Sequence, residues 1–104
     1  MIPLVDLTKA IRSKNAGPDK ITFDVILKDR VAYDLVKKSG VLSRQAVRQL
    51  YGIPDSRLSD HVEFDPAMAI KFTIYRDRPS GSLGDADIFG SQQYGPLLGI
   101  MVPD

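Results

Sequence analysis

The chain has 104 residues, which is enough for one domain of ordinary size and too few for two, since domains cluster near ~100 to 150 residues. Fourteen Lys and Arg residues against thirteen Asp and Glu residues leave a net charge of +1, and nucleic-acid binding would require a larger basic excess. Cysteine is absent, which excludes disulfides, thiolate metal ligands and cysteine nucleophiles. We therefore expect one cytoplasmic domain over residues 1–104 that binds no nucleic acid and, lacking an apolar run of ~18 residues, enters no membrane.

The first third of the chain predicts two strands joined by a loop. Apolar residues at every second position predict a strand over 4–12, although the same stretch also fits a helix. Asn, Gly, Pro and Asp follow one another within 13–19, which indicates a loop. The second strand, over 21–28, shows the clearer alternation, with Ile21, Phe23, Val25 and Leu27 on its apolar side.

Two helices are predicted next, each with its own start signal. Asp29 can cap a helix that ends near Gly40, and Ser43 can cap a second helix that ends at Gly52. A polar link over 54–60 follows.

The last third predicts one strong strand and then a less regular region. Residues 68–75 alternate over eight positions, which is the most regular strand pattern in the chain. A glycine-rich loop over 77–84, a short helix within 85–98 and a final strand over 100–102 complete the prediction.

This order of elements predicts an α+β two-layer sandwich, with an antiparallel or mixed sheet and the helices on one face. We expect a ferredoxin-like arrangement, in its usual order or permuted. The residues expected in the core are Phe23, Val25, Leu35, Val47, Leu50, Ile70 and Phe72.

The first candidate site combines cations, a hydroxyl, an amide and a glycine in one short stretch. A guanidinium offers a planar fork to a carboxylate or phosphate, and free N–H groups of a turn can form an anion-binding nest beside it. The alternative is a solvated turn with charges on its rim. The anion-binding residues proposed here are Arg12, Ser13, Lys14, Asn15 and Gly17.

The second candidate site lies in the glycine-rich stretch 80–95, whose glycines would allow a loop to close over a ligand. The alternative is a surface loop followed by a short helix. Asp85 and Asp87 lack the further ligands of a calcium loop, so we expect no metal site, and no pattern indicates a cofactor. The residues proposed for anion or substrate binding in this stretch are Ser80, Gly81, Asp85, Asp87, Gln92 and Gln93.

The single histidine, His61, is interpreted as an exposed or capping residue rather than a catalytic one. A serine relay would have to use His61, yet the chain has no Gly-x-Ser-x-Gly motif. Asp24 and the Asp65-Pro66 turn are likewise interpreted as structural, so the residues by themselves assign no catalytic group.

The sequence resembles, over nearly its whole length, a small bacterial family known as domain of unknown function 4387. Both candidate sites lie among the motifs that carry this resemblance. The motifs are Arg12-Ser13-Lys14-Asn15-Ala16-Gly17-Pro18, Phe64-Asp65-Pro66-Ala67, Ser80-Gly81-Ser82, Gly84-Asp85-Ala86-Asp87, Gln92-Gln93 and Pro96-Leu97-Leu98. The chain also resembles, less closely, the C-terminal ferredoxin-fold domain of AtuA-type proteins of acyclic terpene utilisation. There a strand leads into an Arg-Ser-Gly-Asp-Lys-Gly loop, whereas this chain has Lys14 and Asn15 for the Gly-Asp pair and Ala16 for the lysine.

The resemblance implies a small cytosolic protein that accompanies a separate large AtuA-type subunit in the breakdown of organic acids or acyl-CoA thioesters. In that reading the chain is a subunit of an enzyme complex, in a homo- or hetero-oligomer, and lends its two loops to a composite carboxylate or acyl-CoA site. One alternative is a stand-alone hydratase or lyase in which Arg12 and Lys14 hold the anion and Asp85 or Asp87 moves a proton. Another alternative is a structural homo-oligomer.

Overall fold

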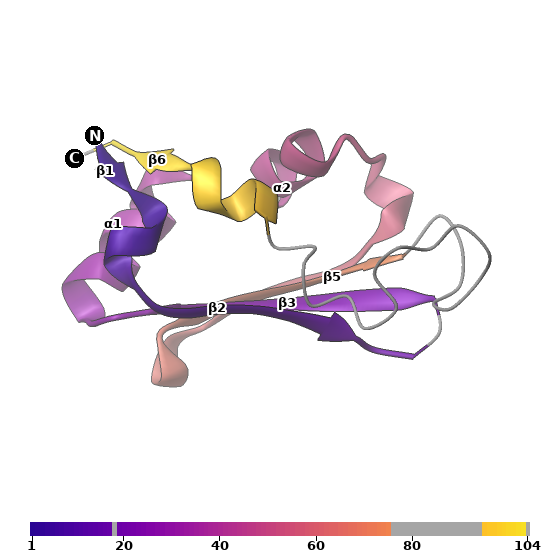
Figure 1. Cartoon of the computed structure of the whole chain (residues 1–104), viewed down its shortest axis with the longest axis horizontal. Coiled ribbons are helices and arrows are strands. Elements are labelled where there is room, and N and C mark those ends of the chain that lie inside the picture. The colour runs from indigo at the N-terminus through magenta and orange to yellow at the C-terminus, as the bar shows by residue number, and fades with distance from the viewer. Residues whose placement is uncertain (18, 76–94, 104) are drawn as a thin grey trace.

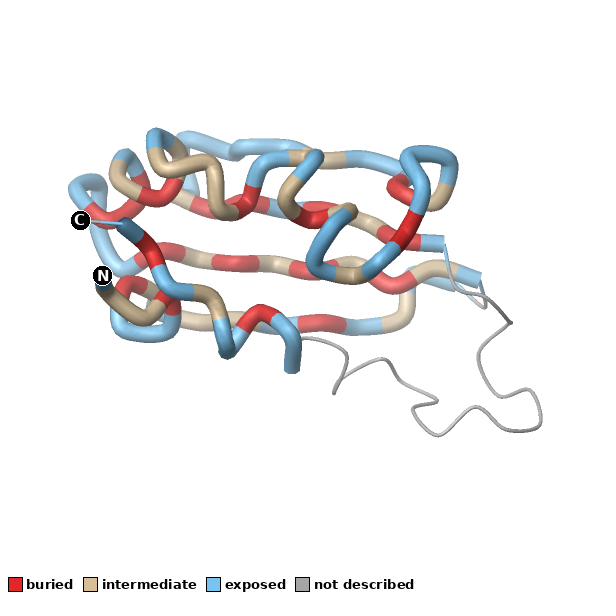
Figure 2. Tube along the Cα trace, turned by 90° about the horizontal axis from the view of Figure 1, so that it is seen from above, coloured by how far each residue is buried: buried red, intermediate tan, exposed pale blue. Residues whose placement is uncertain are grey.

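Four antiparallel strands form the main sheet of the computed structural model, which describes residues 1–17, 19–75 and 95–103 (Figure 1). In spatial order they are β2 (Thr8–Asn15), β3 (Lys20–Leu27), β5 (Ala69–Tyr75) and β4 (Leu58–Phe64). Buried and half-buried residues alternate along all of β3, as the sequence pattern predicts (Figure 2).

Two helices, α1 (Arg30–Ser39) and α2 (Arg44–Tyr51), lie on one face of this sheet (Figure 1). Both predicted N-caps are confirmed: the Asp29 carboxylate accepts from the Ala32 N–H at 2.8 Å, and the Ser43 hydroxyl accepts from the Ala46 N–H at 3.2 Å. Gly40 and Gly52 end the two helices in the left-handed conformation that glycine adopts without strain.

The two ends of the described chain meet in a second, two-stranded sheet. β1 (Ile2–Pro3) pairs with β6 (Met101–Val102), so the predicted last strand exists but lies outside the main sheet. The strand predicted over 4–12 is wrong at its start, because Leu4–Leu7 form a 3₁₀ helix, η1. With three residues per turn, this helix places Leu4 and Leu7 on the same side, and both are buried. A similar helix, η4 (Gly95–Gly99), precedes β6.

β4 is not predicted by the sequence pattern. Its first residues, 58–60, fall in the predicted polar link, and a short 3₁₀ helix, η2 (Asp55–Arg57), precedes them. β4 is an edge strand in which Leu58 is buried and most other residues are exposed, so it lacks the alternation of a half-buried strand.

The predicted α+β two-layer sandwich is confirmed, with an antiparallel sheet and the helices on one face. Hairpin β2–β3 and hairpin β4–β5 are joined by the helices, in the strand order β2-β3-β5-β4. This is the order that a β-α-β-β-α-β ferredoxin-like unit acquires when it is permuted to begin at its middle hairpin.

The core lies between the sheet and the helices. The rings of Phe23 and Phe72, on neighbouring strands, stack with centroids 4.8 Å apart, and the Tyr51 ring of α2 lies 5.3 Å from Phe23. Of the predicted core residues, Leu35 is only partly buried and the prediction for Leu50 is wrong, since Leu50 is 36% exposed. Tyr51, the next residue of α2, packs on Phe23 instead. The confirmed core residues are Phe23, Val25, Val47, Ile70 and Phe72.

Asp65 joins α1 to the turn between β4 and β5, which forms the 3₁₀ helix η3 (Asp65–Ala67). The buried Tyr33 hydroxyl donates to the Asp65 carboxylate, and the Lys37 ammonium lies 3.3 Å from the same oxygen. The Arg30 guanidinium donates to the Asp65 carbonyl. The hydrogen bond from Tyr33 has the largest effect on the pKa of Asp65, and that from Lys37 has the next largest. Both hold this pKa below its ordinary value of 3.8. The structural role expected of Asp65 is thereby confirmed.

We expect Asp65→Asn to lower the melting temperature at neutral pH and to lose that effect in acid. A carboxylate whose pKa is depressed by folding stabilises the fold above its unfolded value of 3.8, and this stabilisation disappears as the pH falls through the folded pKa. Thermal unfolding of both proteins from pH 7 to pH 2 measures the difference, with Asp34→Asn on the exposed side of α1 as the control. A difference that is unchanged in acid would contradict the role of the Asp65 charge.

Candidate functional site

The helices leave the other face of the main sheet without a helical layer in the described part of the chain (Figure 1). We call this surface the open face. Strand register assigns its side chains, because residues that pair across an antiparallel sheet point to the same side. From β2 to β4 the open face consists of Ala10, Arg12 and Lys14; Lys20, Thr22, Asp24 and Ile26; Ala69, Lys71, Thr73 and Tyr75; and Asp60, Val62 and Phe64.

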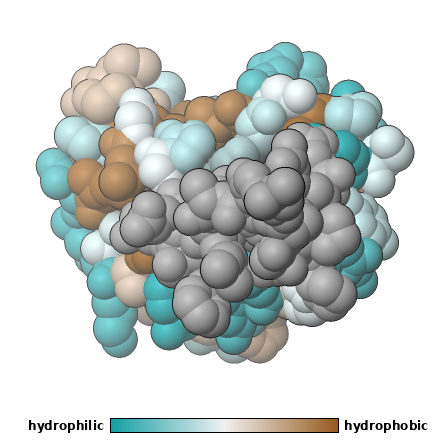
Figure 3. Space-filling model, turned by 45° about the vertical axis from the view of Figure 1, so that its right-hand side comes forward, coloured by the Kyte–Doolittle hydropathy of each residue, from teal (hydrophilic) through white to brown (hydrophobic). Residues whose placement is uncertain are grey.

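Twelve of these side chains form three cross-strand rows that differ in chemistry, and Lys20 and Tyr75 pair beyond the third row. The apolar row, the ionic row and the threonine row follow one another toward the β2–β3 turn. The apolar row consists of Ala10, Ile26, Ala69 and Phe64. The ionic row consists of Arg12, Asp24, Lys71 and Val62. The threonine row consists of Lys14, Thr22, Thr73 and Asp60. The surface is therefore apolar toward one end of the strands and charged toward the other. On the space-filling surface, the lower rim mixes hydrophilic and hydrophobic groups (Figure 3).

Asp24 lies at the centre of the ionic row, between two cations. One carboxylate oxygen is 3.9 Å from the Arg12 guanidinium, and the other is 3.9 Å from the Lys71 ammonium. The Asp24 side chain is only 14% exposed, and its Oδ1 is buried without a hydrogen bond in the described structure. In the next row the hydroxyls of Thr22 and Thr73 are 3.1 Å apart. The charges of the open face are thus close enough to attract one another but are not locked in short contacts.

Arg12 and Lys14 lie on the open face, on the edge strand β2, and the Arg12 side chain is 66% exposed. The prediction of a loop over 13–19 is wrong for its first half, because β2 continues to Asn15. Ser13 pairs with Phe23 and Asn15 with Ile21, so these two residues belong to the helix-covered face. The side chains of the first four of the five proposed anion-binding residues are therefore divided between the two faces of the sheet.

The turn between β2 and β3 holds Gly17, the last of these five residues. Its φ of 94° is a conformation that L side chains rarely adopt, which explains the glycine at this position. The side chains of Arg12 and Lys14 remain on the same face, two positions apart on β2, where a single anion can reach both.

The second candidate site lies outside the described residues. Its residues are Ser80, Gly81, Asp85, Asp87, Gln92 and Gln93. The last described residue before it, Tyr75, pairs with Lys20 at the start of β3, and the Lys20 ammonium lies 5.4 Å from the Tyr75 ring. Arg57 donates two hydrogen bonds to the Tyr75 carbonyl, at 3.0 and 2.7 Å. The end of β5 is therefore fixed beside the β2–β3 turn, and an approach of residues 80–93 to this turn stays a prediction.

His61 has a structural contact. It lies within β4, and its imidazole Nε2 donates to the Leu42 carbonyl at 2.6 Å. Because Leu42 belongs to the connection between the two helices, this bond ties the helical layer to the edge of the sheet.

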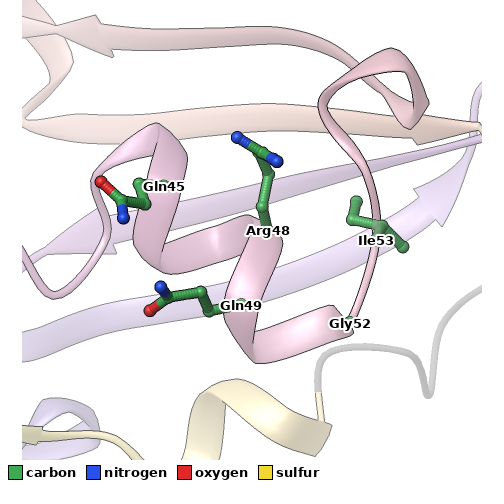
Figure 4. A pocket seen from close by; sticks show the side chains of 5 residues that line it. All are labelled: Gln45, Arg48, Gln49, Gly52 and Ile53. Atoms are coloured by element: carbon green, nitrogen blue, oxygen red, sulfur yellow. The ribbon is translucent and has the colours of Figure 1, made fainter.

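A shallow pocket of about 280 Å³ lies against α2 and the turn that follows it (Figure 4). Gln45, Arg48, Gln49, Gly52 and Ile53 line it. The Arg48 Nε is buried without a hydrogen bond in the described structure, while another nitrogen of the same guanidinium lies 4.0 Å from Asp55. No sequence pattern predicts this pocket, because its residues form no motif and are brought together by the end of the helix.

The residues that the structure describes include no cluster of three or more histidines and carboxylates suited to a metal ion. None of the described helices is both long and apolar enough to cross a membrane.

Comparison with known proteins gives a family and no further relatives. No curated protein and no solved structure matches the chain. A family model described as a domain of unknown function, DUF4387, matches residues 4–101, which is nearly the whole length. The chain belongs to this DUF4387 family.

Proposed function

We propose that this chain is the small partner of an AtuA-like large protein in bacterial organic-acid or acyl-CoA catabolism. In this role it contributes cationic side chains to a composite site for a carboxylate or an acyl-CoA thioester. Membership of DUF4387 is compatible with this role, and the link to AtuA rests on the sequence resemblance around Arg12 to Pro18.

The observation that carries the proposal is the arrangement at the turn end of the sheet. Arg12 and Lys14 share the open face of an edge strand, and Tyr75 pairs with Lys20 at the same end. Tyr75, the last described residue before the second candidate site, therefore lies at the same end of the sheet as Lys14, with β3 between them.

Anion binding at this edge follows from the chemistry of the two side chains. The guanidinium of Arg12 can donate two parallel hydrogen bonds to a carboxylate or phosphate, and Lys14 adds a second charge without fixed geometry. The Arg12–Asp24 distance of 3.9 Å is longer than a charge-assisted hydrogen bond. An incoming anion can therefore recruit Arg12 without first breaking a tight contact. A partner that covers the edge would exclude water and strengthen the interaction.

Purification of the tagged chain from its native bacterium tests the proposal. We expect an AtuA-like large protein to co-purify in a fixed ratio, and the complex to turn over a carboxylate or CoA thioester. Elution of the chain by itself would contradict the partner role. Turnover by the purified chain without a partner would favour the stand-alone hydratase or lyase.

A further inference from the structure

We propose that the open face of the sheet binds a second copy of this chain, in a face-to-face dimer whose two-fold axis runs parallel to the strands. This inference goes beyond the proposed function and does not depend on it. It rests on the strand order and on the charge pattern of the three rows.

The proposed axis lies between the two central strands, β3 and β5, because the sheet order is β2-β3-β5-β4. Rotation about such an axis places β2 opposite β4 of the second copy and β3 opposite β5, with each row facing itself. Packed sheets keep their strands within about 30° of one another. An angle of about 30° between the two sheets would shift facing residues on the edge strands by roughly one position along the strand. A lysine side chain is long enough to span this shift.

The threonine row is complementary to itself under this symmetry. Lys14, at one end of the row, comes opposite Asp60 of the second copy, at the other end, and the reverse contact forms as well. The two hydroxyls of Thr22 and Thr73 occupy the centre. Two attractive charge pairs therefore result from one row.

The ionic row adds the same kind of match at its centre. Asp24 comes opposite Lys71 of the second copy, so each Asp24 carboxylate faces a further cation across the interface. Arg12, 66% exposed on the edge strand, comes opposite the aliphatic Val62 and keeps its charged end at the rim. Arg12 thus stays accessible to an anion in the dimer.

The apolar row supplies the buried contact that a dimer requires. Phe64 is 46% exposed and comes opposite the small Ala10 of the second copy. Ala69, which faces Ile26 of the second copy, is only 1% exposed within its own chain and adds no new contact area. Large side chains therefore face small ones, as in closely packed sheets. Val62 is 47% exposed and adds apolar area at the edge.

The other face-to-face two-fold arrangement, with its axis across the strands, is disfavoured by the same charges. It would place β2 against β2 of the second copy and would bring the Arg12 and Lys14 cations of the two copies near one another. Like charges facing one another in an interface oppose binding. The charge pattern therefore selects the axis parallel to the strands.

Charge reversal tests the dimer. The association of the purified chain is measured by sedimentation equilibrium over a wide range of protein concentration, for the wild type, Lys14→Asp, Asp60→Lys and the double variant. We expect the wild type to dimerise and each single variant to raise the dissociation constant at least about tenfold. The double variant should return it close to the wild-type value.

Rescue by the double variant cannot arise within one chain, because two strands separate β2 from β4 and the edges are ~14 Å apart. Lys38→Asp, the same change at an exposed residue of α1 on the other side of the sheet, is the control and should leave the dissociation constant unchanged. Melting curves verify that the variants fold.

Several outcomes would overturn the proposal. A wild type that is monomeric at all concentrations would mean that the open face is covered by this chain itself or by another protein. A stronger dimer in Lys14→Asp would indicate the axis across the strands. A dimer that no variant affects would use a different surface. Because the experiment uses the purified chain without a large partner, its failure is distinct from failure of the proposed function.

Discussion

Phe72→Ala is expected to lower the free energy of unfolding by about 3 to 5 kcal/mol, the usual loss for removing a buried phenylalanine side chain. Phe72 is fully buried, and its ring stacks on Phe23 and lies 6.2 Å from the ring of Tyr51. Truncation would leave a cavity at the contact between the sheet and α2. Chemical denaturation monitored by circular dichroism measures the loss.

Phe64→Ala provides the matched control, since it removes the same side chain from a position that is 46% exposed. We expect this variant to cost less than about 1 kcal/mol when the protein is diluted enough to be monomeric. Equal losses in the two variants would contradict the assignment of Phe72 to the core and Phe64 to the open face.

Arg12→Ala is expected to weaken the binding of a carboxylate or CoA thioester about 10- to 100-fold and to leave the fold almost intact. The binding loss follows from removing a charge-assisted, bidentate donor, which contributes about 1.5 to 3 kcal/mol. The effect on stability should stay below about 1 kcal/mol, because the pair with Asp24 spans 3.9 Å and Arg12 is 66% exposed. Calorimetric titration of short-chain dicarboxylates and CoA thioesters measures the binding, with the chain alone and with its large partner.

Lys38→Ala is the control for Arg12→Ala, because it removes one exposed positive charge from α1, on the other side of the sheet. We expect its affinity to equal that of the wild type. If Arg12→Ala also binds with wild-type affinity, Arg12 is a solvated charge, and the composite anion site loses its main residue.

Local signals in the sequence were sufficient for the helices and the central strands. The side chains of Asp29 and Ser43 cap helices that Gly40 and Gly52 end, and such caps act within a few residues of one another. β3 is half-buried along its whole length, so the pleat of the strand appears directly as alternation in the sequence. These elements could be predicted because their own residues determine them.

The candidate site was predicted only in part, because turn-forming residues concealed the end of a strand. Ser13 to Asn15 precede Gly17 and were assigned to the loop, yet their pairing with β3 extends β2 to Asn15. This pairing divides the side chains of the first candidate site: Arg12 and Lys14 lie on one face, and Ser13 and Asn15 belong to the other.

By itself the sequence determined the helices, the two central strands and most of the core, since caps, turns and periodicity depend on neighbouring residues. Only the tertiary structure decided that β4 pairs with β5 as an edge strand and that Ile2–Pro3 pairs with residues near the other end of the chain. Such pairings depend on residues that are distant in sequence, and an exposed edge strand leaves no periodic pattern. The tertiary structure also decided the composition of the open face. Each of its rows combines residues from four strands, and these residues become neighbours only when the strands pair in register.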